Sequence, residues 1–101
     1  MKGSHSVSVL QGKEKRCYIT GRTDGLHKHH VFYGTSNRAV SDKYGFWVWL
    51  IPELHNMSDN GVHGKEGHEL DIELKQACQR AVEADGHTRE DFRALIGKSY
   101  L

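Results

Sequence analysis

The apolar positions divide the chain into a β-prone first half and a helical second half. Aromatic and β-branched residues are concentrated in 26–33 and 46–51, which predicts two strands. In the second half, apolar residues recur every three or four positions over 69–84 and again over 89–96, which predicts two amphipathic helices. Strands followed by helices indicate an α+β domain.

Turn residues define how the two strands connect. Residues 34–38 predict a loop, and residues 41–45 predict a single helical turn that ends at its glycine. The strands would then form a hairpin with a long, structured connection. Pro52 stops the second strand and is well placed to begin a short helix that carries His55. The order strand, loop, strand, short helix predicts a ββα unit over about 26–63.

The ends of the chain are less regular. Residues 1–6 are expected to be disordered, residues 6–10 alternate polar and apolar as a short edge strand would, and residues 17–21 form a brief β-prone segment. Thr88 and Asp91 resemble a helix N-cap and its acidic partner, which places the start of the last helix at residue 89.

Length and composition predict one small domain. The chain has 101 residues, enough for one modest core and too few for two domains. No run is long and apolar enough to cross a bilayer, and the start lacks the apolar block of a signal peptide, so we expect a cytoplasmic protein with no membrane partner. Cys17 and Cys78 allow one bridge or two free thiols, and a cytoplasm favours the thiols.

Charge is unevenly distributed along the chain. Residues 1–43 hold eight Lys or Arg and three Asp or Glu, whereas residues 44–101 hold six and ten, which gives +5 and −4. A polyanion would therefore meet the first half, although ordinary scatter of surface charge explains the asymmetry equally well. Trp47 and Trp49 are able to stack on bases, but packing in the core or in an oligomer is the favoured interpretation.

Histidines are the candidate chemistry of the central stretch. Five of the eight histidines lie between residues 26 and 63, and two of them, His29 and His30, are adjacent. Imidazole binds transition metals and moves protons near neutral pH. His29, His55 and His63 would supply three ligands to one metal ion and leave His30 as a general base.

Strand geometry complicates that assignment, because adjacent residues of a regular strand point to opposite faces. Either the strand twists or bulges at His29 and His30, or one of the two side chains faces away from the metal. Taken singly, each histidine is better explained as a surface or hydrogen-bonded residue. Four histidines that bracket a hairpin and a short helix favour a site.

The central pattern resembles a known family. His29-His30-Val-Phe-Tyr-Gly, then Asn37-Arg38, then a hydrophobic strand, Pro52, His55-Asn56 and Gly61-Val62-His63 are similar to phage-type HNH endonucleases, and most similar to the recombination-enhancement, RecA-dependent nucleases. The similarity extends over nearly the whole chain. It implies a ββα-metal (HNH) hairpin-plus-helix core with C-terminal α-helices, as a single nuclease domain over residues 1–101.

The resemblance also implies roles for individual residues. The first histidine of the doublet, His29, would bind the metal and the second, His30, would be the general base. His55 and His63 would be the following metal ligands. Asn37 is the candidate for the asparagine that braces the loop and orients the base, with Asn56 as the alternative. Arg38 would hold phosphate in bidentate fashion, although a solvated arginine explains it nearly as well.

One departure concerns a second metal. Many relatives carry two Cys-x-x-Cys pairs that bind structural zinc, and the corresponding positions here are Cys17 with Thr20 and Ile51 with Leu54. A lone cysteine cannot build a tetrahedral sulfur site. We therefore expect no structural zinc, and a hydrophobic cluster in its place with Cys17 buried in it.

The predicted function is a metal-dependent DNA endonuclease with low sequence specificity. Its cofactor would be one divalent ion: zinc, nickel or manganese suits imidazole ligands, and magnesium fits if waters complete its shell. DNA is the expected partner, with a recombinase filament or a phage protein as a candidate second partner. The alternatives are an inactive nucleic-acid-binding or assembly protein with the same fold, and a histidine-based metal-storage module. The sequence predicts no oligomeric state.

Overall fold

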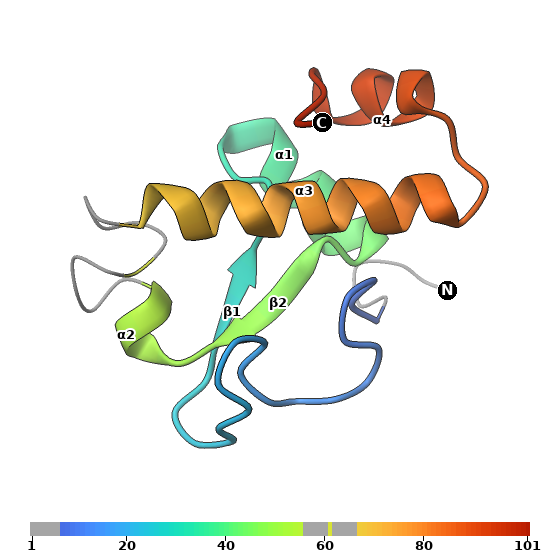
Figure 1. Ribbon diagram of the computed structural model, residues 1–101. Coiled ribbons are helices and arrows are strands. Elements are labelled where there is room, and N and C mark those ends of the chain that lie inside the picture. The colour runs from blue at the N-terminus through green and yellow to red at the C-terminus, as the bar shows by residue number, and fades with distance from the viewer. Residues whose placement is uncertain (1–6, 56–60, 62–66) are drawn as a thin grey trace.

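The chain folds as a small mixed α+β domain in which two short strands lie between helices (Figure 1). The computed structural model describes residues 7–55, 61 and 67–101. The elements are, in order, β1 (His27–His30), α1 (Thr35–Tyr44), β2 (Trp47–Leu50), α2 (Pro52–His55), α3 (His68–Ala84) and α4 (Arg89–Ile96). None of the described helices combines the length and apolar character needed to span a bilayer.

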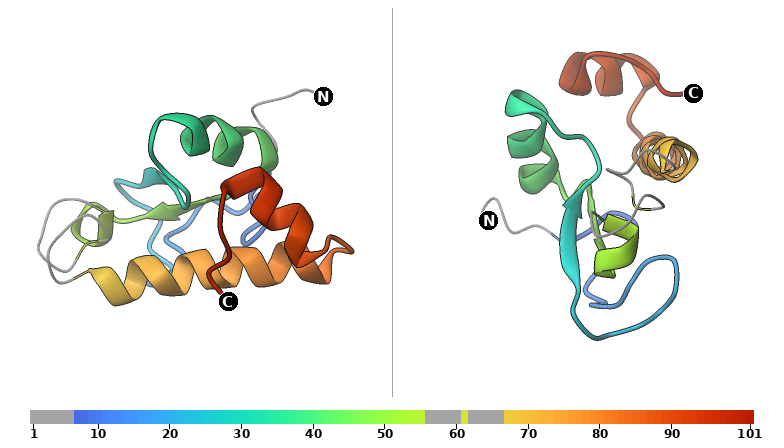
Figure 2. Two further views of the ribbon diagram at one scale, coloured as in Figure 1. Left: turned by 90° about the horizontal axis from the view of Figure 1, so that it is seen from above. Right: turned by 90° about the vertical axis from the view of Figure 1, so that its left-hand side faces the viewer.

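The sheet is an antiparallel pair with a defined register. His27 pairs with Leu50 and His30 pairs with Trp47. Because side chains alternate along a strand, His27 and His29 share one face with Val48 and Leu50, the inner face of the hairpin. The other side, the outer face, carries Lys28, His30, Trp47 and Trp49. Figure 2 shows α2 and α3 on one side of the hairpin and α1 on the other. The two predicted strands are confirmed, each shorter than predicted.

The connection between the strands differs from the prediction. Residues 34–38 do not form a loop, because a single ten-residue helix, α1, begins at Thr35. It ends at Gly45, whose φ of 81° is the left-handed conformation that glycine adopts readily. The buried Ser41 fixes this helix to β1: its Oγ donates to the Phe32 carbonyl at 2.7 Å and accepts from the Phe32 N–H at 3.2 Å. Helix α1 is therefore held by side-chain hydrogen bonds rather than by an apolar stripe.

The N-terminal segment is also irregular where a strand was predicted. Within its described part, Ser8 forms only an isolated bridge with Gly12, so the edge strand over 6–10 is wrong. Ser8 instead donates its hydroxyl to the Trp47 carbonyl, and the Val9 N–H donates to the Gly45 carbonyl at 2.9 Å. Residues 17–21 form a turn rather than a strand. Residues 1–6 lie outside the described part.

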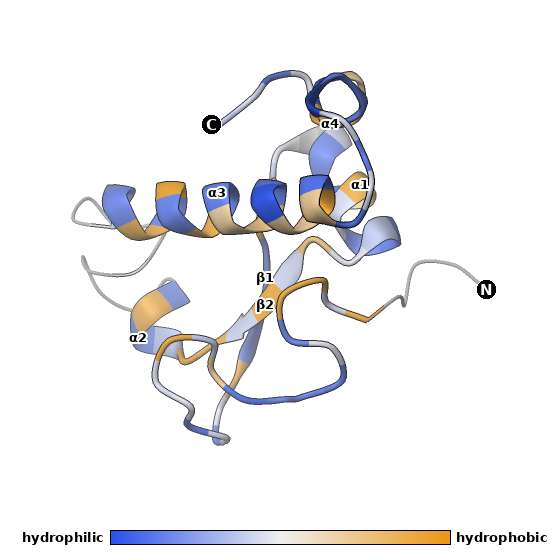
Figure 3. Cartoon of the chain, turned by 45° about the vertical axis from the view of Figure 1, so that its right-hand side comes forward, coloured by the Kyte–Doolittle hydropathy of each residue, from blue (hydrophilic) through white to orange (hydrophobic). Residues whose placement is uncertain are grey.

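Helix α3 lies on the inner side of the hairpin, and α4 packs against α3 and α1, each with its predicted apolar side inward (Figure 2). Leu74, Cys78 and Val82 of α3 join Phe92 and Ile96 of α4 in one buried cluster. Figure 3 shows the apolar side of α3 turned toward the hairpin and its polar side turned outward. The predicted cap of α4 is confirmed, since the Thr88 hydroxyl accepts from the Asp91 N–H and the Asp91 carboxylate accepts from the Thr88 N–H.

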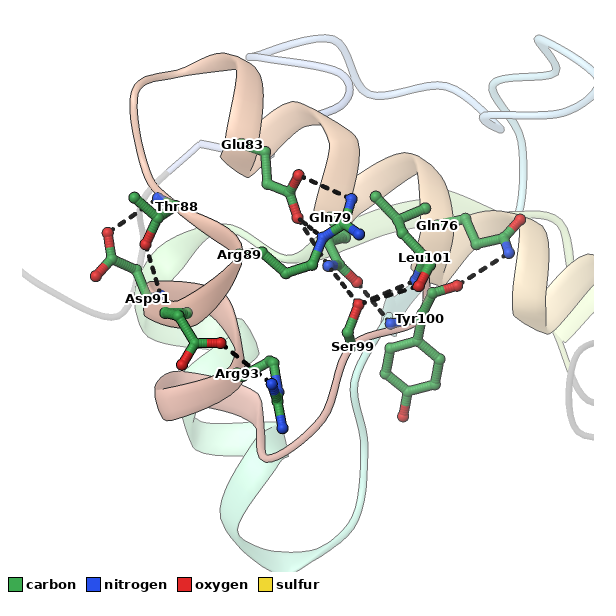
Figure 4. Close-up of polar contacts among 11 residues, drawn as sticks. Gln76, Gln79, Glu83, Thr88, Arg89, Asp91, Arg93, Ser99, Tyr100 and Leu101 are labelled. Carbon is green, nitrogen blue, oxygen red and sulfur yellow. Dashed lines mark hydrogen bonds and ion pairs between the residues drawn. The ribbon is translucent and has the colours of Figure 1, made fainter.

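The C-terminal tail docks on α3 through two glutamines (Figure 4). Gln79 is fully buried, and its Oε1 accepts from the Tyr100 N–H at 2.7 Å while its Nε2 donates to Ser99 Oγ at 3.0 Å. Gln76 donates to the Tyr100 carbonyl at 3.0 Å. The tail thus supplies the donor to Gln79 Oε1, while Gln79 Nε2 also donates to Glu83 Oε2 at 2.8 Å within α3.

Both cysteines are free and buried. Cys17 and Ile51 belong to the same hydrophobic cluster, and Leu54 packs against it, so the predicted burial of Cys17 among apolar side chains is confirmed. Burial raises the pKa of the Cys17 thiol, but hydrogen bonds from Thr20 and from the Ile51 N–H more than offset this and hold the pKa below its ordinary value.

Candidate functional site

Three imidazoles gather where β1 meets α2. The alternation of β1 sends His27 and His29 to the inner face, and α2, which begins at Pro52, brings His55 against them. Nδ1 of His27 lies 3.1 Å from Nδ1 of His55. The ring centroids are 5.2 Å apart for His27 and His55, and 5.3 Å apart for His29 and His55. We call these three residues the histidine cluster.

The Nδ1 contact admits two chemical states. As a hydrogen bond, it requires one imidazole to donate and the other to accept. As a pair of metal ligands, two nitrogens at about 2.05 Å from one ion lie about 2.9 Å apart at a right angle and about 3.4 Å apart at the tetrahedral angle. The observed separation of 3.1 Å between the two Nδ1 atoms lies between those values. The separation of the two nitrogens is therefore compatible with either state.

The described residues do not complete a metal site by themselves. Across 7–55, 61 and 67–101, no group of three or more His, Cys, Asp or Glu side chains is arranged to hold an ion. The predicted ligand His63 and the alternative asparagine Asn56 lie outside the described residues. Of the predicted ligands, the structure brings together His29 and His55.

His30 does not join the histidine cluster. Its side chain is on the outer face of the hairpin, where its Nε2 lies 3.4 Å from the Asp42 carboxylate of α1. Lys28, also on that face, donates to the same carboxylate at 2.7 Å. Hydrogen bonding from Lys28, followed by that from His30, lowers the pKa of Asp42 despite its partial burial. The strand neither twists nor bulges enough to bring both histidines of the doublet to one site.

The outer face combines aromatic rings with ammonium groups. Trp47 and Trp49 meet edge to face, with ring centroids 5.7 Å apart. The Lys28 ammonium lies 4.5 Å from the Trp47 ring centroid, and the Lys15 ammonium lies 4.7 Å from that of Trp49. Trp47 is buried, as the core interpretation predicted, whereas Trp49 is half-buried. This surface has the residue types that bind single-stranded nucleic acid.

The other two predicted catalytic residues lie on α1. Asn37 donates its side-chain amide to the Ile96 carbonyl at 3.0 Å, which ties α1 to the end of α4. This hydrogen bond joins Asn37 to Ile96, a residue that is far from His29 and His30 in the sequence. Arg38 is exposed on the same helix. Their predicted catalytic roles stay predictions.

A buried ion pair adjoins the histidine cluster and was not anticipated from the sequence. Lys75 donates to Asp71 Oδ2 at 2.6 Å, and the Tyr33 hydroxyl donates to the same oxygen at 3.1 Å. The Tyr33 ring lies 6.2 Å from the ring of His29, centroid to centroid. Burial lowers the pKa of Lys75, but its hydrogen bonds to Asp71 and Tyr33 outweigh burial and raise the pKa overall. The signal in the sequence was a charged pair spaced four residues apart on the apolar side of α3.

His27 was also not assigned to the candidate site from the sequence. Its signal was the spacing His27-x-His29, which puts both side chains on one face of a strand. Comparison with protein-family models, with curated proteins and with solved structures gave no match.

Proposed function

We propose that the protein is a divalent-metal-dependent endonuclease of the HNH type that hydrolyses DNA phosphodiester bonds with low sequence specificity. In this proposal β1, β2 and α2 form the ββα-metal unit. The observation that carries the proposal is the 3.1 Å approach of the His27 and His55 Nδ1 atoms, with the ring of His29 beside them. The sequence resemblance to HNH nucleases supplies the reaction class.

His27 and His55 would hold the ion, and His29 is the next nearest described imidazole. Nitrogen ligands favour zinc, nickel or manganese, while magnesium would need water for most of its shell. When bound, such an ion neutralises charge on the phosphate and acidifies water. In this proposal, an imidazole of the cluster that does not bind the ion would accept the proton of the attacking water.

This proposal changes the role of His30. A general base must lie within hydrogen-bond reach of the water that it deprotonates. His30 faces Asp42 on the outer face, so the proposal assigns it and Lys28 to the binding of the DNA strand. Arg38, exposed on α1, is a further candidate for phosphate contact.

The test is nicking of supercoiled plasmid DNA by the purified protein with manganese, nickel, zinc or magnesium. His27→Ala and His55→Ala should each lower the metal-dependent rate by about a hundredfold or more, the size of a typical loss of acid–base or ligand function. His87→Ala is the matched control, because His87 is exposed and lies beyond the far end of α3. Unchanged nicking by the His27 and His55 variants refutes the proposal.

The His30→Ala variant separates the two faces. If His30 only helps to bind DNA, the variant should cleave at a normal rate under saturating DNA and show weaker binding. If His30→Ala abolishes cleavage while His27→Ala does not, the doublet works as the family resemblance implies and the assignment to the inner-face cluster is wrong.

A second candidate function is nucleic-acid binding or assembly without catalysis. The outer face favours it, because the half-buried Trp49 with Lys15, and Lys28 beside Trp47, lie on the opposite side of the hairpin from the histidine cluster. Salt-dependent DNA binding without cleavage in any metal would establish this alternative. Tight metal binding with no DNA affinity would instead indicate metal storage. Dependence on a recombinase filament or a phage protein is tested by adding that partner to the same assay.

A further inference from the structure

A pocket of about 500 Å³ opens between the N-terminal segment, the end of α1, the end of α3 and α4. It lies toward the opposite end of α3 from α2 and the histidine cluster (Figure 1). Its apolar wall is formed by Val9, Phe46, Ala81, Val82, Phe92 and Leu95. The volume falls in the range of about 300–1,000 Å³ that is typical of ligand sites. The proposed nuclease chemistry does not use this pocket.

Two of the described residues that line the pocket carry carboxylates. Asp85 and Asp91 are among the lining residues together with His87, and none of the lining residues that the structure describes is Lys or Arg. Hydrogen bonds from the backbone N–H and the side chain of Thr88 lower the pKa of Asp91, which keeps that carboxylate ionised at neutral pH. Asp85 is the C-cap of α3, where the helix dipole adds further negative potential.

Two arginines near the pocket are already paired with acids. Arg89 lies 3.1 Å from the Glu83 carboxylate, and Arg93 lies 3.1 Å from that of Glu90. They therefore contribute little positive potential to the rim. An apolar wall with an acidic rim is complementary to an apolar group that carries a cation, and it repels phosphate.

We propose that this pocket binds a peptide segment of a partner protein, in which a large apolar side chain stands next to a lysine or an arginine. The apolar side chain fills the pocket against Phe92 and Leu95, and the cation reaches Asp85 and Asp91. DNA is the wrong occupant for this end of the molecule, so partner and nucleic acid would bind at separate places.

Three probes of the same length test the proposal by NMR titration of the full chain labelled with ¹⁵N. The probes are the dipeptide amides Ac-Phe-Arg-NH₂, Ac-Phe-Gln-NH₂ and Ac-Phe-Glu-NH₂. The first should shift the amide signals of Ala81 and Leu95, the second should bind about three times more weakly because it lacks the cation, and the third should bind more weakly still. The signals of His27 and His55 should not move.

Two variants test whether the carboxylate of Asp85 contributes to the binding of the Phe-Arg probe. Asp85→Asn should weaken the Phe-Arg probe by about two- to fivefold. Asp24→Asn, which alters an exposed aspartate paired with Arg22 far from the pocket in sequence, should leave the affinity unchanged. The inference is overturned if the Phe-Arg probe shifts no pocket signal, if all three probes bind equally, or if a DNA oligonucleotide shifts the same signals. It is also overturned if these signals move with protein concentration alone, which would identify a second copy as the occupant.

Discussion

Replacing Asp71 by asparagine removes one charge from the buried pair beside the histidine cluster and leaves its shape almost unchanged. Asp71 and Lys75 are 7% and 6% exposed, so neither charge is well hydrated. Removal of one partner leaves a buried, unpaired ammonium, which costs about 3–5 kcal/mol in comparable cases. Since a domain of this size has a free energy of unfolding of about 5–15 kcal/mol, the loss is a large fraction of the total.

The loss of unfolding free energy in Asp71→Asn should become smaller as the pH rises. In the wild-type protein, hydrogen bonds to Asp71 and Tyr33 raise the pKa of Lys75 above 10.5 against the opposing effect of burial. The pair therefore stabilises the fold at neutral pH, and this stability is lost only as the pH rises through that raised pKa. Without Asp71, burial dominates and lowers the pKa of Lys75. The variant is therefore destabilised at any pH at which Lys75 is still charged in the folded protein. The difference in unfolding free energy between wild type and Asp71→Asn should therefore shrink from pH 7 to pH 10.

Urea unfolding followed by circular dichroism measures this difference, and a double variant provides the control. Asp71→Asn with Lys75→Met removes both charges, and it should recover most of the lost stability, because an uncharged pair of similar volume is often as stable as the buried ion pair. If the double variant is no more stable than Asp71→Asn, or if the destabilisation is the same at pH 7 and pH 10, the unpaired ammonium is not the cause.

Three further changes test the packing of the fold. Gln79→Leu should lower the unfolding free energy by about 1–3 kcal/mol, because the half-buried Tyr100 loses the acceptor of its N–H, and urea unfolding would contradict this if the loss were absent. Thr88→Ala should cost about 0.5–2 kcal/mol through loss of the α4 cap, whereas Thr23→Ala at an exposed turn should cost nothing measurable. In the folded protein without denaturant, iodoacetamide should label Cys17 before Cys78, because hydrogen bonds lower the pKa of Cys17 whereas burial raises that of Cys78 to about 12. Mass spectrometry would refute this if Cys78 reacted first.

The elements that were predicted well are those with a local signal of their own. Helix α3 repeats apolar residues at helical spacing over 17 residues, and α4 begins at a reciprocal cap between Thr88 and Asp91. The strand at Trp47–Leu50 combines β-branched and aromatic residues, and Pro52 marks its end. In each case the physical cause of the element lies within the element or beside it.

The elements that were predicted wrongly depend on distant partners. Residues 35–44 contain few apolar residues, and the helix there is held by Ser41 at the Phe32 backbone and by Asn37 at the Ile96 carbonyl. The N-terminal segment is held by Ser8 at the Trp47 carbonyl, 39 residues away. A pattern read within one window of the sequence does not reveal which distant carbonyl a short polar side chain will meet.

The same reasoning explains why the site could be predicted only in part. The number and spacing of the histidines indicated that some would gather, and His29 and His55 do so. Which histidine completes the group follows from the two-residue period of β1, and that period selects His27 and turns His30 toward Asp42. Adjacent histidines in a regular strand point to opposite faces, so His29 joins the histidine cluster and His30 lies with the tryptophans and lysines of the outer face. If the protein is a nuclease, we expect the inner face to supply the chemistry and the outer face to hold the strand, so that variants on the two faces change different kinetic constants.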